Sequence, residues 1–202
     1  MTIAEKAPDY RCTFAGTGLL SAYAWTGTGD IRPGTAQWAK STDSSGYTGN
    51  ISVNGQAYGS SAGDGYAMYH LDIGAQAKKI VCNLKNTGTD VGDGVSIYLR
   101  TTGTQITGFD YISVSLFIDT GPQKKLSIFD GVQAPVEINI TTDFNTILQT
   151  LTIIDTGTEI VAQIGSFIVS LATSEGAGAT SIAIEGHDPA TTCVWDNLEV
   201  WI

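Results

Sequence analysis

The sequence predicts an all-β protein built as a two-sheet antiparallel β-sandwich. Apolar and polar residues alternate with a period of two along many short stretches, the pattern of strands with one buried face. The i, i+3, i+4 spacing of apolar residues that is typical of amphipathic helices is almost absent. Turn residues such as Gly, Asp and Thr separate the stretches at the short intervals expected of antiparallel sheets.

Along the chain we expect an N-terminal arm at residues 1–9 and a single sandwich domain at residues 10–202. Residues 15–65 are rich in Gly, Ser and Thr and predict a loop-rich region, with short strands in AQWAK and GNISVN. No linker, charge block or internal repeat divides the chain. One domain is therefore the expected organisation.

The middle of the chain carries the clearest strand patterns. KKIVCNLK, GVSIYLR and DYISVSLFI each place apolar residues on one side and polar or aromatic residues on the other. The expected core residues of these three strands are Ile80, Cys82, Leu84, Val95, Ile97, Leu99, Ile112, Val114, Leu116 and Ile118. Further strands are expected in KKLSIF, VEINI, LQTLTII, EIVAQI, SFIVSL and TSIAIE.

The last stretch, VWDNLEVWI, predicts a core strand. Alternation puts Val194, Leu198, Val200 and Ile202 on the core side, and Trp195, Asn197, Glu199 and Trp201 on the other side. Asp196 falls on the apolar side. Either a bulge at Asp196 and Asn197 redirects its side chain, or buried donors bind its carboxylate, because an unpaired buried charge is costly.

Charge and hydropathy limit the partners. The net charge is −10, from 20 acidic and 10 basic residues, and no basic cluster is present, so we expect no nucleic-acid partner. No apolar run reaches membrane-spanning length, and the start MTIAEKAPDY lacks the apolar core of a secretory signal. We therefore expect no membrane partner and synthesis in the cytoplasm.

Three cysteines, Cys12, Cys82 and Cys193, form an odd set without a CxxC motif, which argues against a zinc site and against a secreted disulfide framework. Buried free thiols are the expected state. A bridge between Cys12 and Cys193 stays open if the first and last strands are neighbours.

Several segments together resemble the concanavalin A-like jelly roll of lectins, glucanases and laminin-G domains. They are TFAGTGLLSAYAW, the following QWA, the central strands, LTIIDTGTEIVAQIGS and the closing VWDNLEVWI. The resemblance covers about residues 10–202 and implies that the first and last strands are neighbours. These motifs concern packing and turns, so they bear on fold far more than on activity.

The residues argue against an enzyme. Glucanases of this fold carry an E-x-D-x-E strand that supplies paired carboxylates, and this spacing is missing, since each Glu stands singly. A Ser/His/Asp triad has no GxSxG motif to support it. We therefore expect no catalytic residues.

Two kinds of binding site are predicted. In carbohydrate binding, Trp25, Tyr47, Tyr58 and Tyr66 could stack on sugar rings, although Trp in a sandwich is more often core. No cofactor is expected, but the sequence leaves a calcium site open at Asp90 and Asp93 in GTDVGDG. Plain turn chemistry is the competing interpretation of that stretch.

Our first functional prediction is a non-catalytic structural protein of a virus particle, such as a capsid decoration (cement) protein or a tail appendage subunit of a bacteriophage. Its partners would be virion proteins such as a major capsid or tail protein, it would form a homo-oligomer such as a trimer, and its location would be the virion. The alternative is a lectin-like module that binds a glycan. A polysaccharide-degrading enzyme is the third and least supported hypothesis.

Overall fold

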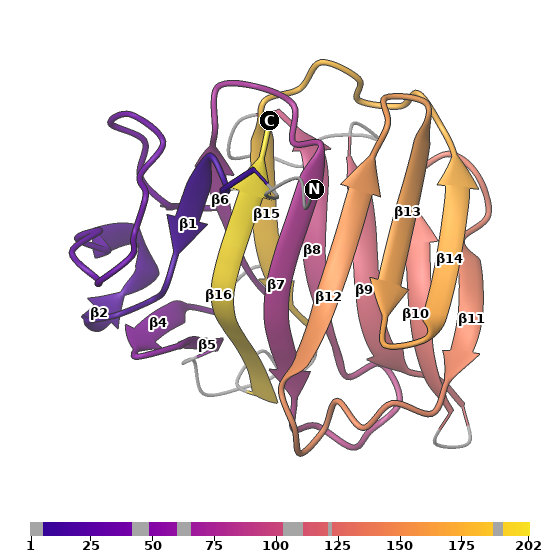
Figure 1. The fold of residues 1–202 in the computed structure, drawn as a ribbon. Helices are drawn as coiled ribbons and strands as arrows, with labels where there is room; N and C mark the ends of the chain where they lie inside the picture. The colour runs from indigo at the N-terminus through magenta and orange to yellow at the C-terminus, as the bar shows by residue number, and fades with distance from the viewer. Residues whose placement is uncertain (1–5, 42–48, 60–65, 103–110, 121–122, 188–191) are drawn as a thin grey trace, which may run out of the picture.

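Two antiparallel sheets face each other in the computed structural model, which describes residues 6–41, 49–59, 66–102, 111–120, 123–187 and 192–202 (Figure 1). The predicted all-β sandwich is confirmed. Within these ranges, none of the helical segments has the length and apolarity needed to span a bilayer.

The nine-stranded sheet, in front in Figure 1, has the order β14-β13-β12-β7-β16-β5-β4-β2, with β1 also paired to β16. Its strands are β1 (Tyr10–Cys12), β2 (Thr17–Leu19), β4 (Ile51–Asn54), β5 (Ala57–Gly59), β7 (Lys79–Asn86), β12 (Gln149–Asp155), β13 (Glu159–Ile164), β14 (Phe167–Ala172) and β16 (Cys193–Trp201). A short 3₁₀ helix, η1 (Leu20–Ala22), follows β2.

The seven-stranded sheet lies behind it and has the order β11-β10-β9-β8-β15-β6-β3. Its strands are β3 (Ala39–Lys40), β6 (Ala67–Asp72), β8 (Gly94–Thr101), β9 (Ile112–Ile118), β10 (Lys124–Phe129), β11 (Val136–Ile140) and β15 (Ser181–Gly186). All its neighbouring strands run antiparallel.

The core lies between the sheets and consists of the apolar side chains that alternation predicts. All ten of the core residues expected in β7, β8 and β9 are buried there. Trp38, Trp195, Tyr69, Phe14 and Phe144 are the largest aromatic side chains enclosed with them. Period-two patterning therefore fixes which face of each of these strands is apolar.

The final strand, β16, changes its phase at a bulge. Its pairing with β7 shifts between Asp196 and Glu199, and Asn197 has a φ of 48°. Trp195 is fully buried before the shift, and Leu198 and Val200 are buried after it. The prediction that Val194 points to the core and Trp195 away from it is wrong, because the extra residue reverses the alternation. Asp196 is half-buried, and Gln56 donates a hydrogen bond to it.

The first and last strands pair side by side, with Tyr10 opposite Val200 and Cys12 opposite Leu198. The backbone before β1 follows the same edge, because Asp9 N–H donates to the Val200 carbonyl and Trp201 Nε1 donates to the Lys6 carbonyl. The N-terminal segment from residue 6 is thus hydrogen-bonded to the end of the chain.

All three cysteines are buried and free. A bridge between Cys12 and Cys193 is not formed, since the register places Leu198 opposite Cys12. Burial raises the pKa of both the Cys12 and the Cys193 thiols to about 12. These thiols are therefore protonated and inert at neutral pH.

One buried ion pair ties the two sheets together. Arg100 of β8 has a φ of 52°, where the pairing with β15 is irregular, and its side chain reaches Asp155 at the end of β12. Arg100 Nη2 lies 2.5 Å from Asp155 Oδ1 and Nε lies 2.8 Å from Oδ2, and neither side chain is exposed. The fork geometry fixes one end of the sandwich.

Candidate functional site

The outer face of the seven-stranded sheet carries polar side chains that are buried. Every residue of β8 is buried, including Ser96 and Tyr98, whose phase points away from the core. Ser113, Ser115 and Ser127 on the neighbouring strands are also buried. In a strand with one buried face, the outward side chains would be exposed to solvent. Here the outward side chains are buried as well, so this face is covered or hollowed.

The strand register aligns these side chains in rows across the sheet. One row runs from β15 to β11 through Glu185, Ser96, Ser115, Ser127 and Glu137. The next row places Phe129 beside Ser113 and Tyr98. On the other side, Phe117 lies opposite Gly94 and Lys125. A line of serines therefore runs between two aromatic borders.

A groove of about 360 Å³ lies over these rows. Its lining consists of Tyr66, Gly92, Ser113, Ser115, Phe117, Ser127, Phe129, Pro135, Glu137 and His187. Phe117 and Phe129 are half-buried, and Tyr66 is exposed and stands edge-on to His187 at 5.6 Å between ring centroids. The groove is within the size range of small-molecule sites.

The serine floor offers hydroxyls for binding. Ser115 is bonded to Ser96 at 2.6 Å between the two oxygens. The hydroxyls of Ser113 and Ser127 make no hydrogen bond to any residue in the part of the chain that the structure describes. A ligand with hydroxyl groups could supply partners to both, since each serine hydroxyl both donates and accepts.

Glu185 organises the inner end of the groove. Its Oε2 accepts a 2.6 Å hydrogen bond from the Tyr98 hydroxyl and lies 2.8 Å from His187 Nε2. Burial opposes a charge on His187, but the charge and hydrogen bond of Glu185 outweigh burial and raise the pKa of His187. Glu185 thus favours the protonated form of His187.

His70 lies one row away, opposite Ala183 on β15, and is 2% exposed. Among the described residues, neither of its ring nitrogens has a hydrogen-bond partner. Burial lowers the pKa of His70 to about 4, although the charge of Glu185 acts in the opposite direction. His70 is therefore neutral at physiological pH.

This arrangement does not form a serine triad. Ser96 Oγ and Glu185 Oε2 both bind His187 through the same nitrogen, Nε2. A relay needs the serine and the acid on different ring nitrogens. Ser96, His187 and Glu185 are thus linked by hydrogen bonds, but their geometry does not activate Ser96 as a nucleophile.

The two carboxylates of the serine row are far apart. Four strand spacings separate Glu185 from Glu137. At about 4.8 Å per spacing, this is roughly 19 Å along the sheet. Glycoside hydrolysis needs two carboxyl groups about 5 to 9.5 Å apart, so Glu185 and Glu137 cannot form such a pair.

The structure does not bring the four predicted aromatic residues together. Tyr66 lines the groove. Tyr58 lies on β5 of the other sheet, and Trp25 packs edge-on against Tyr23 and donates from Nε1 to Gln37. Tyr47 lies outside the described residues. Neighbouring Gly and Ser residues in the sequence indicate that an aromatic ring is exposed, but they do not indicate which sheet it lies on.

The predicted calcium ligands form a turn. Asp90 N–H donates to Asp93 Oδ2 at 2.7 Å, and Asp93 N–H donates to the Asp90 carbonyl. Asp93 is 2% exposed. Across the ranges given above, no three His, Cys, Asp or Glu side chains gather as a potential metal site. The carboxylate of Asp93 is thus engaged in turn chemistry.

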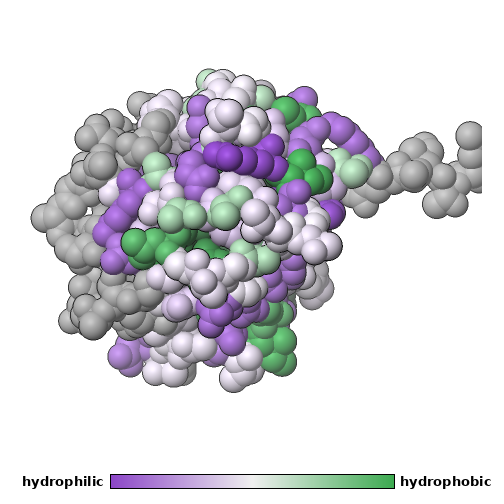
Figure 2. Space-filling view, turned by 90° about the vertical axis from the view of Figure 1, so that its left-hand side faces the viewer, coloured by the Kyte–Doolittle hydropathy of each residue, from purple (hydrophilic) through white to green (hydrophobic). Residues whose placement is uncertain are grey.

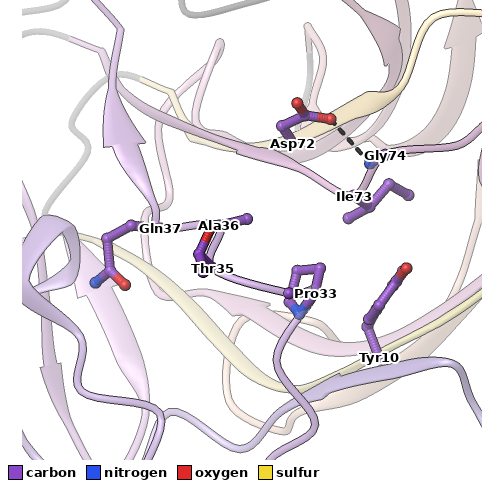
Figure 3. Close-up of a pocket in the computed structure, with 9 residues that line it drawn as sticks. Tyr10, Pro33, Thr35, Ala36, Gln37, Asp72, Ile73 and Gly74 are labelled. Carbon is purple, nitrogen blue, oxygen red and sulfur yellow. Dashed lines mark hydrogen bonds between the residues drawn. The ribbon is translucent and has the colours of Figure 1, made fainter.

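A second pocket, of about 440 Å³, opens at the edge near β1. Figure 2 views this side of the molecule, where apolar residues form several separate patches. Figure 3 shows Tyr10, Pro33 and Ile73 around the pocket, with Asp72 bonded to Gly74 N–H. The Gln37 amide donates to backbone carbonyls of Ser21 and Tyr23. This pocket lacks the aligned hydroxyls of the groove, so we place the candidate site in the groove.

Sequence reasoning missed most of the groove residues, namely Ser113, Ser115, Phe117, Ser127, Phe129, Glu137, Glu185 and His187. A signal was present. The outward phase of three neighbouring strands contains serine and aromatic residues, with Ser96 and Tyr98 in β8, and Ser-x-Ser-x-Phe in β9. Solvent-facing strands usually carry charged residues in this phase, so serine with aromatics marks a binding face.

Comparisons with known proteins agree with the fold. No protein-family model matches the chain, and a search of curated proteins finds no match. Among solved structures, the chain is similar to a β-glucanase from Bacillus licheniformis, with a TM-score of 0.60, 11% identity, and coverage of 93% of this chain and 99% of that chain.

Two non-enzymatic domains are also similar. A legume lectin-like domain from Entamoeba histolytica has a TM-score of 0.56 and 10% identity, covering 81% of this chain and 89% of its own. A carbohydrate-binding module from Bacillus subtilis has a TM-score of 0.53 and 8% identity, covering 81% and 93%. At these identities the similarity shows the fold alone, which is the concanavalin A-like β-sandwich.

Proposed function

We propose that the protein is a lectin-like module that binds carbohydrate in the groove on the outer face of the seven-stranded sheet. The observation that carries this proposal is the serine floor next to the rings of Phe117 and Phe129, where the hydroxyls of Ser113 and Ser127 have no hydrogen-bond partner among the described residues. Sugars present hydroxyl groups at their edges and C–H groups on their faces. A floor of hydroxyls with aromatic borders complements both surfaces.

The structural neighbours support the same class of ligand, since they include a lectin-like domain and a carbohydrate-binding module. They also include a glucanase. The wide separation of Glu185 and Glu137 favours binding over hydrolysis by these two residues. The absence of catalysis stays a prediction, as does a role in a virus particle, which no comparison tests.

Isothermal titration against a panel of oligosaccharides tests the proposal, with two groove variants. Phe117→Ala removes an aromatic border, and Ser127→Ala removes one hydroxyl at small cost in volume. Each loses an interaction worth about 1 kcal/mol, so each should weaken binding roughly fivefold.

Ile168→Ala is the matched control, because Ile168 is 55% exposed on β14 of the opposite sheet. It should leave affinity unchanged, and circular dichroism checks that every variant is folded. An absence of saccharide binding by the unaltered protein would refute the proposed function. Binding that survives in both groove variants would place the ligand elsewhere.

A further inference from the structure

At each end of the groove, an acidic side chain is bonded to a basic one. Glu137 and His187 are the ionisable carboxyl and imidazole groups in its lining. Lys125 Nζ lies 2.7 Å from Glu137 Oε2, and His187 pairs with Glu185 at 2.8 Å. Glu137 therefore already has a partner of opposite charge, and His187 is already hydrogen-bonded to an acid.

No lysine or arginine lines the groove, so none is placed there to bind an anionic ligand. All ten lysines and arginines of the chain fall within the described ranges, so each can be placed. Lys125, beside the groove, is held by both Asp119, at 2.6 Å, and Glu137. Its ammonium group is already shared between two carboxylates.

The other nine basic residues lie outside the groove lining. Four pair with carboxylates outside the groove: Lys6, Arg11, Arg100 and Lys124. Two bind carbonyl or amide oxygens: Arg32 and Lys40. Three belong to the nine-stranded sheet or its border: Lys78, Lys79 and Lys85.

Recognition of sulfate or carboxylate groups generally uses an arginine fork, a lysine or the N-terminus of a helix. The lining contains no lysine or arginine and no residue of the three-residue helix η1. The net charge of −10 adds repulsion. An anionic sugar would lose water beside Glu137 and gain no ion pair.

We infer that the groove selects uncharged saccharides and discriminates against sulfated or carboxylated ones, an inference that rests on the proposed function. The serine hydroxyls can exchange hydrogen bonds with neutral sugar hydroxyls at no electrostatic cost. The aromatic borders accept any pyranose face and add no charge preference. The discrimination then comes from the carboxylate of Glu137 and from the lack of a lysine or arginine in the lining.

The test uses matched oligosaccharides of equal length and linkage, one neutral and one sulfated, titrated into the full chain. The sulfated form should bind at least tenfold more weakly. Affinity for the neutral form should change by less than about twofold between roughly 10 mM and 200 mM NaCl, because binding forms no ion pair. Equal or tighter binding of the sulfated form would overturn the inference and leave carbohydrate binding intact.

Binding of neither form would instead refute the proposed function together with this inference. Glu137→Gln sharpens the result, because it removes one groove carboxylate and frees Lys125 from one of its two partners. The variant should discriminate severalfold less against the sulfated form. Glu159→Gln on β13 of the opposite sheet is the control and should keep the full discrimination. Unchanged selectivity in Glu137→Gln would contradict the electrostatic origin.

Discussion

Removing Asp155 should leave the buried positive charge of Arg100 without its counter-ion. The Arg100 guanidinium has no solvent exposure and makes two short hydrogen bonds to this carboxylate. Asp155 also accepts hydrogen bonds from Gln76 Nε2 and Gly157 N–H. Breaking a buried pair from one side costs about 3 to 5 kcal/mol. Asp155→Ala should therefore lower the free energy of unfolding by about 4 kcal/mol.

Urea unfolding followed by circular dichroism measures this loss. For a chain of 202 residues, each kcal/mol shifts the melting temperature by about 2 to 4 °C, so the melting temperature should fall by roughly 8 to 16 °C. Lys6→Ala is the control, since Lys6 is 65% exposed in its pair with Asp9. That variant should cost less than about 1 kcal/mol.

The double variant Arg100→Met with Asp155→Leu separates charge from packing. Replacing both members by apolar residues removes the uncompensated charge, so most of the stability should return. The reasoning fails if Asp155→Ala costs no more than Lys6→Ala. It also fails if the double variant is less stable than Asp155→Ala, because the stability would then have been lost through poorer packing and not through an uncompensated charge.

Two further predictions concern the binding face. The folded pKa of His70, about 4, lies below the unfolded value near 6.5, so unfolding takes up a proton as the pH falls through this window and stability is lost. By pH 4.5 this loss of unfolding free energy amounts to about 2.5 kcal/mol. His70→Leu should remove that part of the difference in unfolding free energy between pH 7 and pH 4.5, as measured with urea. An equal difference in both proteins would contradict the prediction. Gly94→Ala would place its Cβ 2.9 Å from Phe117 Cβ and 3.3 Å from His187 Nδ1. It should weaken saccharide binding severalfold at a stability cost of about 1 to 3 kcal/mol, measured by titration and urea unfolding, and unaltered affinity would exclude these two side chains from the binding surface.

The strands and the core could be predicted because a buried sheet face imposes a period of two on the sequence. In β7, β8 and β9 that period persists without interruption, and the expected core residues are the observed ones. In β16 the same reasoning placed Trp195 on the wrong side. A bulge adds a residue without changing composition, and only the misplaced Asp196 hinted at it.

The candidate site was harder to predict because it is assembled across strands. Glu185 and Ser96 face each other although 89 positions separate them in the numbering, and the pairing of β15 with β8 and β6 is a property of topology. Of the predicted aromatic residues that the structure describes, Tyr66 alone lines the groove. Flanking residues indicate whether a ring sits in a turn, but they do not indicate which sheet surrounds it.

The bulge at Asn197 makes the length of the closing segment more important than its composition. Leu198 and Val200 reach the interior because one extra position precedes them. If the strand instead ran from Trp195 in regular alternation through both Asp196 and Asn197, Glu199 and Trp201 would point inward and Leu198 and Val200 outward. The backbone conformation at Asn197, and not the alternation of the letters, therefore decides which side chains of the closing strand enter the core.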